Sequence, residues 1–404
     1  MNPLLVSGYG ISINVDKRKL VIREKGKQVH EFYPHQINYD SLIIEGYYGN
    51  ISFEAIRWLM KHNITVSVLN WNGNLLSVFL PKEPINGKLK IRQYEIYINE
   101  KERLKIAEKI LEEKIRKSEN MLYELSEYYP EIEHIKVKKR IEKEEKLKRD
   151  MELKEENKPK LSYLLMYEGR VAQIYWKELS KIFNKLYPEF NFTSRSTKSY
   201  SWNMNASDEI NALLNYSYAL LESMIRKHIN AVGLDPSIGF LHELASSKTP
   251  LVYDLQELFR WVSDLSVIQL LEDKKLKKSS FIVTENYHIR LKPQTSKLLV
   301  EKFKLNMNKK YEVGKKRYTL ETIMFNTVRS LGKYILGKSN TLKFEIPYIR
   351  IEHIEPELTE KILKMTPEER KARGINKSTL WYQKKKLAQG KSIKVYGKVK
   401  SKLK

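Results

Sequence analysis

The stretch "SLIIEGYYGNISFEAIRWLMKHNITVSVLNWNGNLLSVFLP" (residues 41–81) decides the fold class of the first part of the chain. Three short β-branched runs, "SLIIEGY", "ITVSVLN" and "LLSVFLP", flank one segment with helical spacing, "SFEAIRWLMKHN". Such runs, separated by turn residues such as "NWNGN", predict strands, and Ser52 suits the N-cap of a helix over residues 52–63. The upstream runs "LLVSGYGISINV" and "KLVIRE" continue the pattern, so we predict a β-rich first domain over residues 1–87.

From about Lys88 the apolar spacing becomes helical and largely stays so until about Leu336. A charged excursion of mixed sign, at about residues 131–160, indicates a solvated helix or a flexible segment without a site. A short β-like patch, "LKFEIPYIRIEHI" (residues 342–354), closes the region. We therefore predict an α-helical second domain over residues 88–355.

The last part of the chain, residues 356–404, has a different composition. Residues 365–404 hold 13 Lys or Arg against two acids. Within them, "TPEERKARGINKSTLWYQKKKL" predicts a helix with Thr366 as N-cap and Pro367 at N1, a turn at Gly374, and a second helix capped by Ser378. This is the pattern of a helix-turn-helix, whose second helix enters the major groove of DNA. The alternative is a basic tail that binds nucleic acid without a fold of its own. The candidate DNA contacts are Lys377, Ser378, Thr379, Lys384, Lys385 and Lys386.

Composition narrows the class of protein. The 404 residues include no cysteine, which excludes disulfides, thiolate zinc sites and cysteine nucleophiles, and fits a cytoplasmic protein of prokaryotic type. The N-terminus lacks the basic region of a signal peptide, and no apolar run approaches the roughly 18 residues of a membrane span. The net charge of +25 favours nucleic acid as the partner, with a lysine-rich or thermophilic surface as the alternative.

Three acidic side chains and one histidine are the candidates for chemistry. Glu168 falls inside the apolar stripe of a predicted helix, where an ionised carboxylate needs a cation, a metal or a proton, a distant arginine being the structural alternative. Asp254 and Glu257 are three residues apart on a second predicted helix, where Arg260 is able to pair with one of them. The stripe around Glu168 consists of Leu161, Leu164, Leu165, Ala172, Tyr175 and Leu179.

His242 ends the turn "GLDPSIGFLHE" (residues 233–243), 12 residues before Asp254. A lone histidine is most often an ordinary core or surface residue. Its coincidence with a stripe carboxylate and an acid pair instead favours a site for Mg²⁺ or Mn²⁺, since one nitrogen and two or three carboxylate oxygens suit these ions. Such an ion beside a basic surface polarises a phosphodiester, so the residues alone favour a metal-dependent DNA-processing site.

The motifs "YEGRVAQIYW", "DEINALLNYSYALLE", "GLDPSIGFLHE" and "LVYDLQELFR" resemble, in order and spacing, the CRISPR-associated Cas-one integrase and endonuclease family. The resemblance covers about residues 4–340. It implies an α+β multidomain fold, with a β-sandwich-like N-terminal domain and an all-α catalytic domain, assembled as dimers. It also implies double-stranded DNA as partner, and integration in which a DNA 3′-hydroxyl attacks a target phosphodiester by transesterification.

Carried over by position, the resemblance gives Glu168, His242 and Glu257 as ligands of Mg²⁺ or Mn²⁺. Some family members have aspartate where this chain has Glu257. Asp254 matches a nearby acid, either an alternative ligand or a residue that supports the ligands, and Arg195 matches a basic position that contacts DNA. A motif that packs beside the site contains Asn211, Asn215 and Tyr216.

The C-terminal module distinguishes this chain from most of the family. It resembles the helix-turn-helix of casposases, the relatives that mobilise casposon transposons. We therefore favour a casposase-like DNA integrase with endonuclease activity, acting as a homo-oligomer. The alternatives are a CRISPR spacer-acquisition integrase with a small Cas partner subunit, a metal-dependent nuclease that uses water, and a non-catalytic helix-turn-helix protein.

Overall fold

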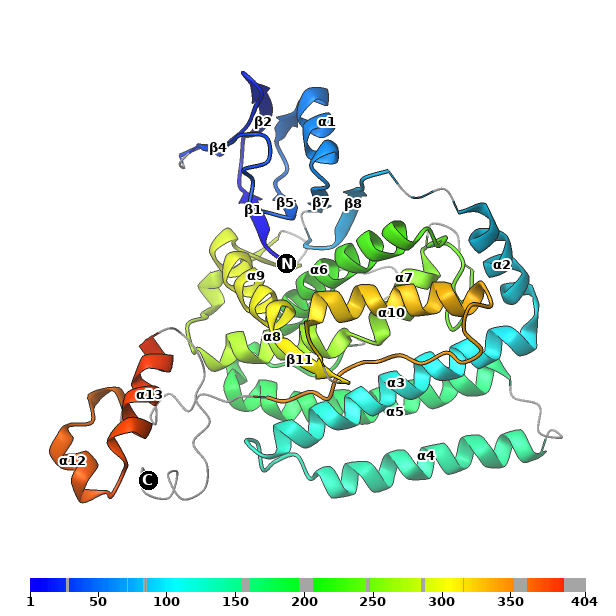
Figure 1. The fold of residues 1–404 in the computed structure, drawn as a ribbon. Helices are drawn as coiled ribbons and strands as arrows, with labels where there is room; N and C mark the ends of the chain where they lie inside the picture. Colours follow the sequence, from blue (N-terminus) through cyan, green and yellow to red (C-terminus); the bar gives the residue numbers. More distant parts are fainter. Residues whose placement is uncertain are drawn as a thin grey trace. The chain divides into compact units, whose positions relative to one another are not determined.

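The computed structural model describes residues 1–26, 29–70, 72–82, 84, 86–154, 160–195, 206–244, 248–284, 288–314, 316–351 and 362–388. The chain forms two compact units, Met1–Tyr123 with Glu131–Tyr348, and Glu124–Pro130 with Ile349–Lys404. As predicted, the fold is α+β, with strands gathered in the N-terminal region and helices following them (Figure 1). The predicted domain boundaries at 87/88 and 355/356 stay predictions.

The N-terminal region consists of two four-stranded sheets. One has the order β1 (Pro3–Ser7), β5 (Ser41–Glu45), β7 (Thr65–Leu69), β8 (Leu75–Phe79). The other has the order β4 (His30–Phe32), β3 (Lys19–Arg23), β2 (Ile11–Asp16), β6 (Gly49–Ile51). The β1–β5 and β5–β7 pairs are parallel, as is β2–β6, whereas β8 is antiparallel to β7 and β3 is antiparallel to both β2 and β4. The sequence patterns found the long strands and missed β4 and β6, which have three residues each.

One apolar core joins both sheets and helix α1 (Phe53–Lys61). Val6 and Val66 come from the first sheet, Ile13 from the second, and Leu59 from α1. Burial of each such side chain stabilises the fold by about 1.5–3 kcal/mol. The predicted N-cap is confirmed, because the Ser52 side chain accepts a hydrogen bond from the backbone N–H of residue 55.

The following region is mainly helical, and α6 lies at its centre. Helix α6 is buried along most of its length and packs against α7, α8, α9 and α10. Tyr216 of α6 donates to Glu45 Oε2 of β5 at 3.2 Å, which ties the helices to the first sheet. The helices are α2 (Gly87–Ile98), α3 (Glu100–Ser126), α4 (His134–Lys154), α5 (Leu161–Leu186), α6 (Glu209–Val232), α7 (Pro250–Glu257), α8 (Arg260–Glu272), α9 (Pro293–Asn308) and α10 (Leu320–Ile335), with 3₁₀ turns η1 (Pro188–Phe190) and η2 (Lys278–Ser280). No helix in the described part of the chain is both long enough and apolar enough to cross a membrane.

The structure resolves the charged excursion as a helix over most of its length. Helix α4 packs one side against α5 and carries ion pairs one turn apart, such as Arg149 with Glu145. The second reading of this segment, a flexible one, is therefore wrong for residues 134–154. Residues 155–159 lie outside the described part of the chain.

Two expectations for this region are corrected. It is not wholly helical, because it contains the antiparallel hairpins β9 (Phe281–Val283)–β10 (Ile289–Leu291) and β11 (Lys310–Val313)–β12 (Lys316–Thr319). The β-like patch forms no strand over its described residues, 342–351. Its alternating apolar side chains are buried, but the carbonyl oxygens of Ile346 and Pro347 accept hydrogen bonds from Lys117 Nζ instead of pairing with a strand.

The second unit contains the predicted helix-turn-helix pattern. Helix α12 (Pro367–Ala372) has Thr366 as N-cap and Pro367 in its first turn, and Gly374 adopts a positive φ of 59° in the turn. Helix α13 (Lys377–Ala388) begins two residues earlier than a cap at Ser378 predicts. The predicted cap at Ser378 is wrong, because Asn376 Oδ1 accepts from the backbone N–H of Ser378 at 3.1 Å.

Candidate active site

His242 lies in the turn between α6 and α7. Helix α6 ends at Gly233, whose φ of 84° favours glycine, and Gln93 of α2 then donates to the backbone oxygens of Asp235 and Ile238. At Gly239 an added Cβ would lie 2.6 Å from Pro250 Cβ, so only glycine fits there. The turn is thus closely packed against α2 and α7 just before it reaches His242.

Asp254 of α7 fixes the end of this turn. Its fully buried carboxylate accepts four hydrogen bonds: Oδ2 from the backbone N–H groups of Phe240 and Leu241, and Oδ1 from the backbone N–H and the ring Nδ1 of His242. The Nδ1–Oδ1 distance is 2.8 Å. Because Nδ1 is engaged, Nε2 is the ring nitrogen left to bind an ion.

Glu168, His242 and Glu257 converge from three elements, α5, the α6–α7 turn and α7. One ligand atom of each lies within 4.8 Å of the other two. The Glu168 and Glu257 side chains are 16% and 5% exposed, so these carboxylates are largely removed from water. Asp254 is not part of this cluster, because both of its oxygens are used within the turn.

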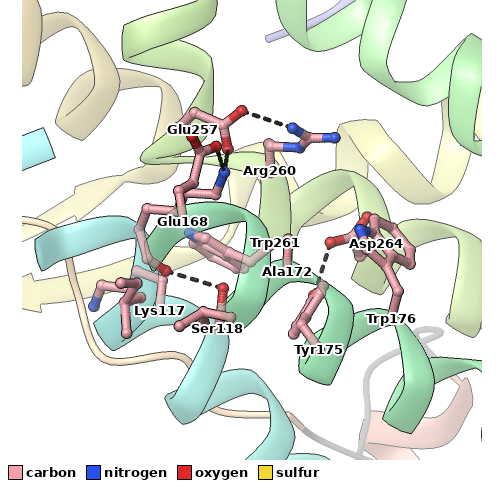
Figure 2. Close-up of a pocket in the computed structure, with 13 residues that line it drawn as sticks. Lys117, Ser118, Glu168, Ala172, Tyr175, Trp176, Glu257, Arg260, Trp261 and Asp264 are labelled. Atoms are coloured by element: carbon pink, nitrogen blue, oxygen red, sulfur yellow. Dashed lines mark hydrogen bonds and ion pairs between the residues drawn. The ribbon is translucent and has the colours of Figure 1, made fainter. Parts of the chain in front are cut away.

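Two cations hold the buried carboxylates (Figure 2). Lys114 of α3 donates a hydrogen bond to Glu168 Oε1 and forms an ion pair with Glu257 Oε2 at 2.8 Å. Arg260, at the start of α8, donates to Glu257 Oε1 at 2.6 Å, on the other side of that carboxylate from Glu168. The sequence left open whether the acids meet a cation or a metal, and Arg260 does pair with one acid. The chain itself bends after Glu257, so α7 and α8 are separate helices rather than the single helix that was predicted.

The electrostatics follow from these partners. Burial alone would raise the pKa of Glu257, but the charges of Arg260 and Lys114 hold it at about 2. Burial opposes protonation of His242, yet its bond to Asp254 and the nearby Glu257 and Glu168 raise its pKa above the usual value. Glu257 is therefore ionised throughout the physiological pH range, whereas His242 holds a proton more readily than a free imidazole.

The donor set fits a hard divalent ion. Two carboxylates and one imidazole are ligands that Mg²⁺ and, more readily, Mn²⁺ accept, with water completing the coordination sphere. The carboxylate behind the imidazole is the usual support of a metal-binding histidine. Within the described part of the chain, Glu168, His242 and Glu257 form the group of His, Asp or Glu side chains whose ligand atoms lie close enough together to hold a metal ion.

A ring-and-cation layer lies beside the cluster and contains the predicted Arg195. The Arg195 and Arg260 guanidinium groups both lie against the Tyr218 ring, at 5.2 and 4.7 Å from the ring centroid. Arg195 also donates to the side-chain oxygens of Asn211 (2.6 Å) and Asn215 (3.0 Å). The guanidinium is thus already held inside the protein, and Tyr216, predicted beside the site, instead reaches the N-terminal sheet.

The candidate DNA contacts on α13 divide into two groups. Lys377, Ser378 and Lys385 are exposed, and Thr379 is half-buried. Lys384 turns back into the module, where its Nζ donates to the backbone oxygen of Met365 at 2.9 Å. The side chain of Lys386 lies outside the described residues. Two exposed aromatic residues on the same helix, Trp381 and Tyr382, were not predicted as contacts.

Sequence reasoning missed Lys114 and Asp264. Asp264 is fully buried, and its two oxygens accept from the hydroxyls of Tyr218 (2.5 Å) and Tyr175 (2.7 Å). A signal for Lys114 exists, since it follows the buried Ile110 and Leu111 by four and three residues on the same helix face. A lysine in an apolar stripe needs a buried anion as partner.

Comparisons with known proteins identify close structural relatives. Residues 4–304 match the family described as CRISPR associated protein Cas1. A solved structure described as a casposase bound to integration product has 39% sequence identity and a TM-score of 0.78, covering 90% of this chain and 99% of that one. The CRISPR-associated endonuclease Cas1 1 of Archaeoglobus fulgidus is 26% identical over 83% of this chain and 96% of its own length. A Cas1 protein from Thermotoga maritima shares the fold, with 19% identity and a TM-score of 0.67 over 85% of this chain and 99% of that one.

Proposed function

The chain belongs to the CRISPR-associated Cas1 family as a casposase-like member, and from this premise we propose that it is a divalent-metal-dependent DNA integrase that mobilises a casposon. The observation that carries the proposal is that the ligand atoms of Glu168, His242 and Glu257 converge and that Asp254 holds the His242 ring in place. Integrase and endonuclease chemistry is that of the family, and the metal dependence and the joining step are inferred from this site.

Glu168, His242 Nε2 and Glu257 would hold Mg²⁺ or Mn²⁺. When bound, the ion would stabilise the negative charge that develops on the attacked phosphate and on the leaving oxygen. Asp254 acts as a positioning residue, because it keeps the proton of His242 on Nδ1 and the lone pair on Nε2. Arg260 fixes one oxygen of Glu257 and so turns the other toward Glu168.

The joining step is an exchange of phosphodiester bonds. The oxygen of a DNA 3′-hydroxyl loses its proton and forms a bond to a target phosphorus, while the bond from that phosphorus to the leaving oxygen breaks and that oxygen takes up a proton. The number of phosphodiester bonds is unchanged, so the step needs no external energy source. Hydrolysis at the same site differs in using water as the nucleophile, which accounts for endonuclease activity.

DNA recognition is assigned to the C-terminal module and to the overall charge. The exposed Lys377, Ser378 and Lys385 and the half-buried Thr379 on α13 are suited to the major groove, and Lys386 belongs to the same proposal. A net charge of +25 supplies phosphate contacts elsewhere. Arg195 is proposed to contact DNA only at the edge of its guanidinium that the two asparagines leave open.

The integrase is expected to act as a homo-oligomer, a dimer or larger. A mobile element has two ends, and each end needs an active site. The described residues contain one cluster of candidate ligands, so two ends require at least two copies. Light scattering of the complex with DNA ends measures this directly.

A joining assay tests the proposed function. An end-labelled oligonucleotide that carries candidate element ends is incubated with supercoiled plasmid, with Mn²⁺ or with chelator. We expect label to become covalently attached to plasmid only with metal, and Glu168→Ala, His242→Ala and Glu257→Ala each to abolish joining while DNA binding persists. Full joining by all three variants would refute the site, and free nicks without joined label would indicate a nuclease.

Spacer acquisition in a CRISPR system is the second candidate, because the curated relative is named a CRISPR-associated endonuclease. The two functions differ in what the chain needs. A casposase joins its own element ends without a partner, whereas an adaptation integrase requires a small Cas partner subunit. A non-catalytic helix-turn-helix protein would bind the same DNA, insensitive to chelator, and yield no joined product.

A further inference from the structure

Lys114 lies where a divalent ion would have to bind. Its Nζ donates a hydrogen bond to Glu168 Oε1 and forms an ion pair with Glu257 Oε2 at 2.8 Å. The other oxygen of Glu257 is committed to Arg260 at 2.6 Å, so Oε2 is the oxygen left for an ion. The ammonium and the ion therefore compete for the same lone pairs.

The surroundings make this competition strong. The Lys114 side chain is 14% exposed, and the two carboxylates are buried to a similar degree, so water screens the three charges poorly. Without a cation, two adjacent carboxylates in a dry site repel each other. The ammonium of Lys114 offsets this repulsion and holds Glu168 and Glu257 close together.

The lysine also has room to leave. A cavity of about 50 Å³ adjoins the carboxylate pair: Lys114, Glu168 and Glu257 line it together with Ser118, Trp176 and Trp261. This volume holds a water molecule or a displaced ammonium. The long, rotatable stem of lysine lets Nζ swing out of the carboxylate pair while its backbone stays fixed in α3.

Resting on the proposed metal site, we propose that Lys114 is a built-in counter-ion of the Glu168 and Glu257 carboxylates, which a divalent ion must displace and which thereby sets the metal affinity. Removal of a competing counter-ion should tighten metal binding. If Lys114 had only a structural role, its removal would disturb the ligands and weaken metal binding.

The first test is Mn²⁺ binding to the full chain at fixed pH and ionic strength, measured by the electron paramagnetic resonance signal of free Mn²⁺. Lys114→Met keeps the length of the side chain and removes its charge. We expect its Kd for Mn²⁺ to be at least about tenfold lower than that of the unsubstituted chain, because the competing cation is gone. Without metal, the variant should unfold at a lower temperature, and Mn²⁺ should restore more of its thermal stability.

Controls separate the outcomes. Lys109→Met removes an exposed lysine of the same helix, paired with Glu112, and should leave the Kd unchanged. Lys114→Arg keeps the charge and should not tighten binding. Equal or weaker Mn²⁺ binding by Lys114→Met would overturn the counter-ion role. Absence of Glu168-dependent binding in every variant, including the unsubstituted chain, would instead refute the metal site.

A second measurement uses only the unsubstituted chain, so it tests the proposal even if Lys114→Met does not fold. Lysine acetylation by an activated ester is followed at individual residues by peptide mass spectrometry, with and without Mn²⁺. We expect the rate at Lys114 to rise when Mn²⁺ displaces its ammonium, and the rate at Lys109 to stay constant. A Lys114 rate that is unchanged or falls with Mn²⁺ contradicts the proposal.

Discussion

Asparagine in place of Asp254 tests how the His242 turn is built. In the unsubstituted chain, four N–H groups point at the two oxygens of this carboxylate. Asparagine has one acceptor oxygen, so it satisfies two of these groups and aims its own NH₂ at the others. If the oxygen stays with Phe240 and Leu241, the NH₂ faces His242.

The magnitude has two parts. A hydrogen bond to a charged group contributes about 1.5–3 kcal/mol, and two are lost at a fully buried position, so the free energy of unfolding should fall by about 3–6 kcal/mol. The second part concerns the imidazole. The asparagine NH₂ donates to Nδ1, which moves the ring proton to Nε2 and removes the lone pair that would bind the ion. Loss of such a supporting partner typically weakens metal affinity by about 10–100-fold.

Two assays separate these parts. Urea denaturation without metal measures the stability of Asp254→Asn, His242→Ala and the double variant, and Mn²⁺ titration of the folded proteins measures affinity. We expect the histidine variant to lose affinity with little loss of stability, because its side chain is 32% exposed. Since Asp254 acts through His242, the double variant should bind Mn²⁺ no more weakly than His242→Ala alone.

Two results would refute this reasoning. Additive losses of Mn²⁺ affinity in the double variant would make Asp254 a ligand in its own right. Unchanged affinity in Asp254→Asn, despite lower stability, would mean that the carboxylate supports the turn without orienting the imidazole.

Three further predictions concern other parts of the chain. Lys385→Ala should lower DNA affinity and reduce the slope of log affinity against log salt by about 0.9. Lys384→Ala should leave the slope unchanged, because the Lys384 Nζ donates to a backbone oxygen within the module. Fluorescence anisotropy at several salt concentrations measures both slopes. Burial lowers the pKa of His228 to about 4, so the unfolded chain binds a proton there below pH 6.5 and the folded chain does not. Stability should therefore fall by about 3 kcal/mol between pH 6.5 and 4, and His228→Leu should remove that loss in urea denaturation at each pH. Gly239→Ala places a Cβ 2.6 Å from a proline carbon and should cost about 1–3 kcal/mol of stability and weaken Mn²⁺ binding, as urea denaturation and Mn²⁺ titration would reveal.

Local patterns predicted the elements that local physics decides. The Ser52 and Thr366 caps, and the apolar alternation of the long strands, depend on residues within a few positions of each other. The alternation in residues 342–351 has the same form but predicted a strand wrongly. A strand needs a neighbouring backbone, and here the side chain of Lys117, more than 200 residues away, takes the carbonyl oxygens.

The candidate site was predictable only in part for the same reason. His242 and Asp254 are 12 residues apart, and their proximity follows from one turn. Glu168 joins them from 74 residues upstream, and its place was indicated by its position in an apolar stripe and by the family resemblance. Lys114 belongs to a helix rich in lysine, where composition does not distinguish the two side chains that point inward, Lys114 and Lys117, from the exposed ones.

Glu257 divides its carboxylate between two cations. Its two oxygens serve different partners, Oε1 for Arg260 at 2.6 Å and Oε2 for Lys114 at 2.8 Å. Arg260 lies three residues along the chain and is itself stacked on Tyr218, so that oxygen is fixed from within the fold. The side chain thus reaches a cation with each oxygen, and Oε2 lies on the side of Lys114, which is also paired with Glu168. The pair of cations also holds the pKa of Glu257 at about 2 despite its burial, so this ligand is ionised and aligned before an ion arrives, and binding need not remove a proton from it.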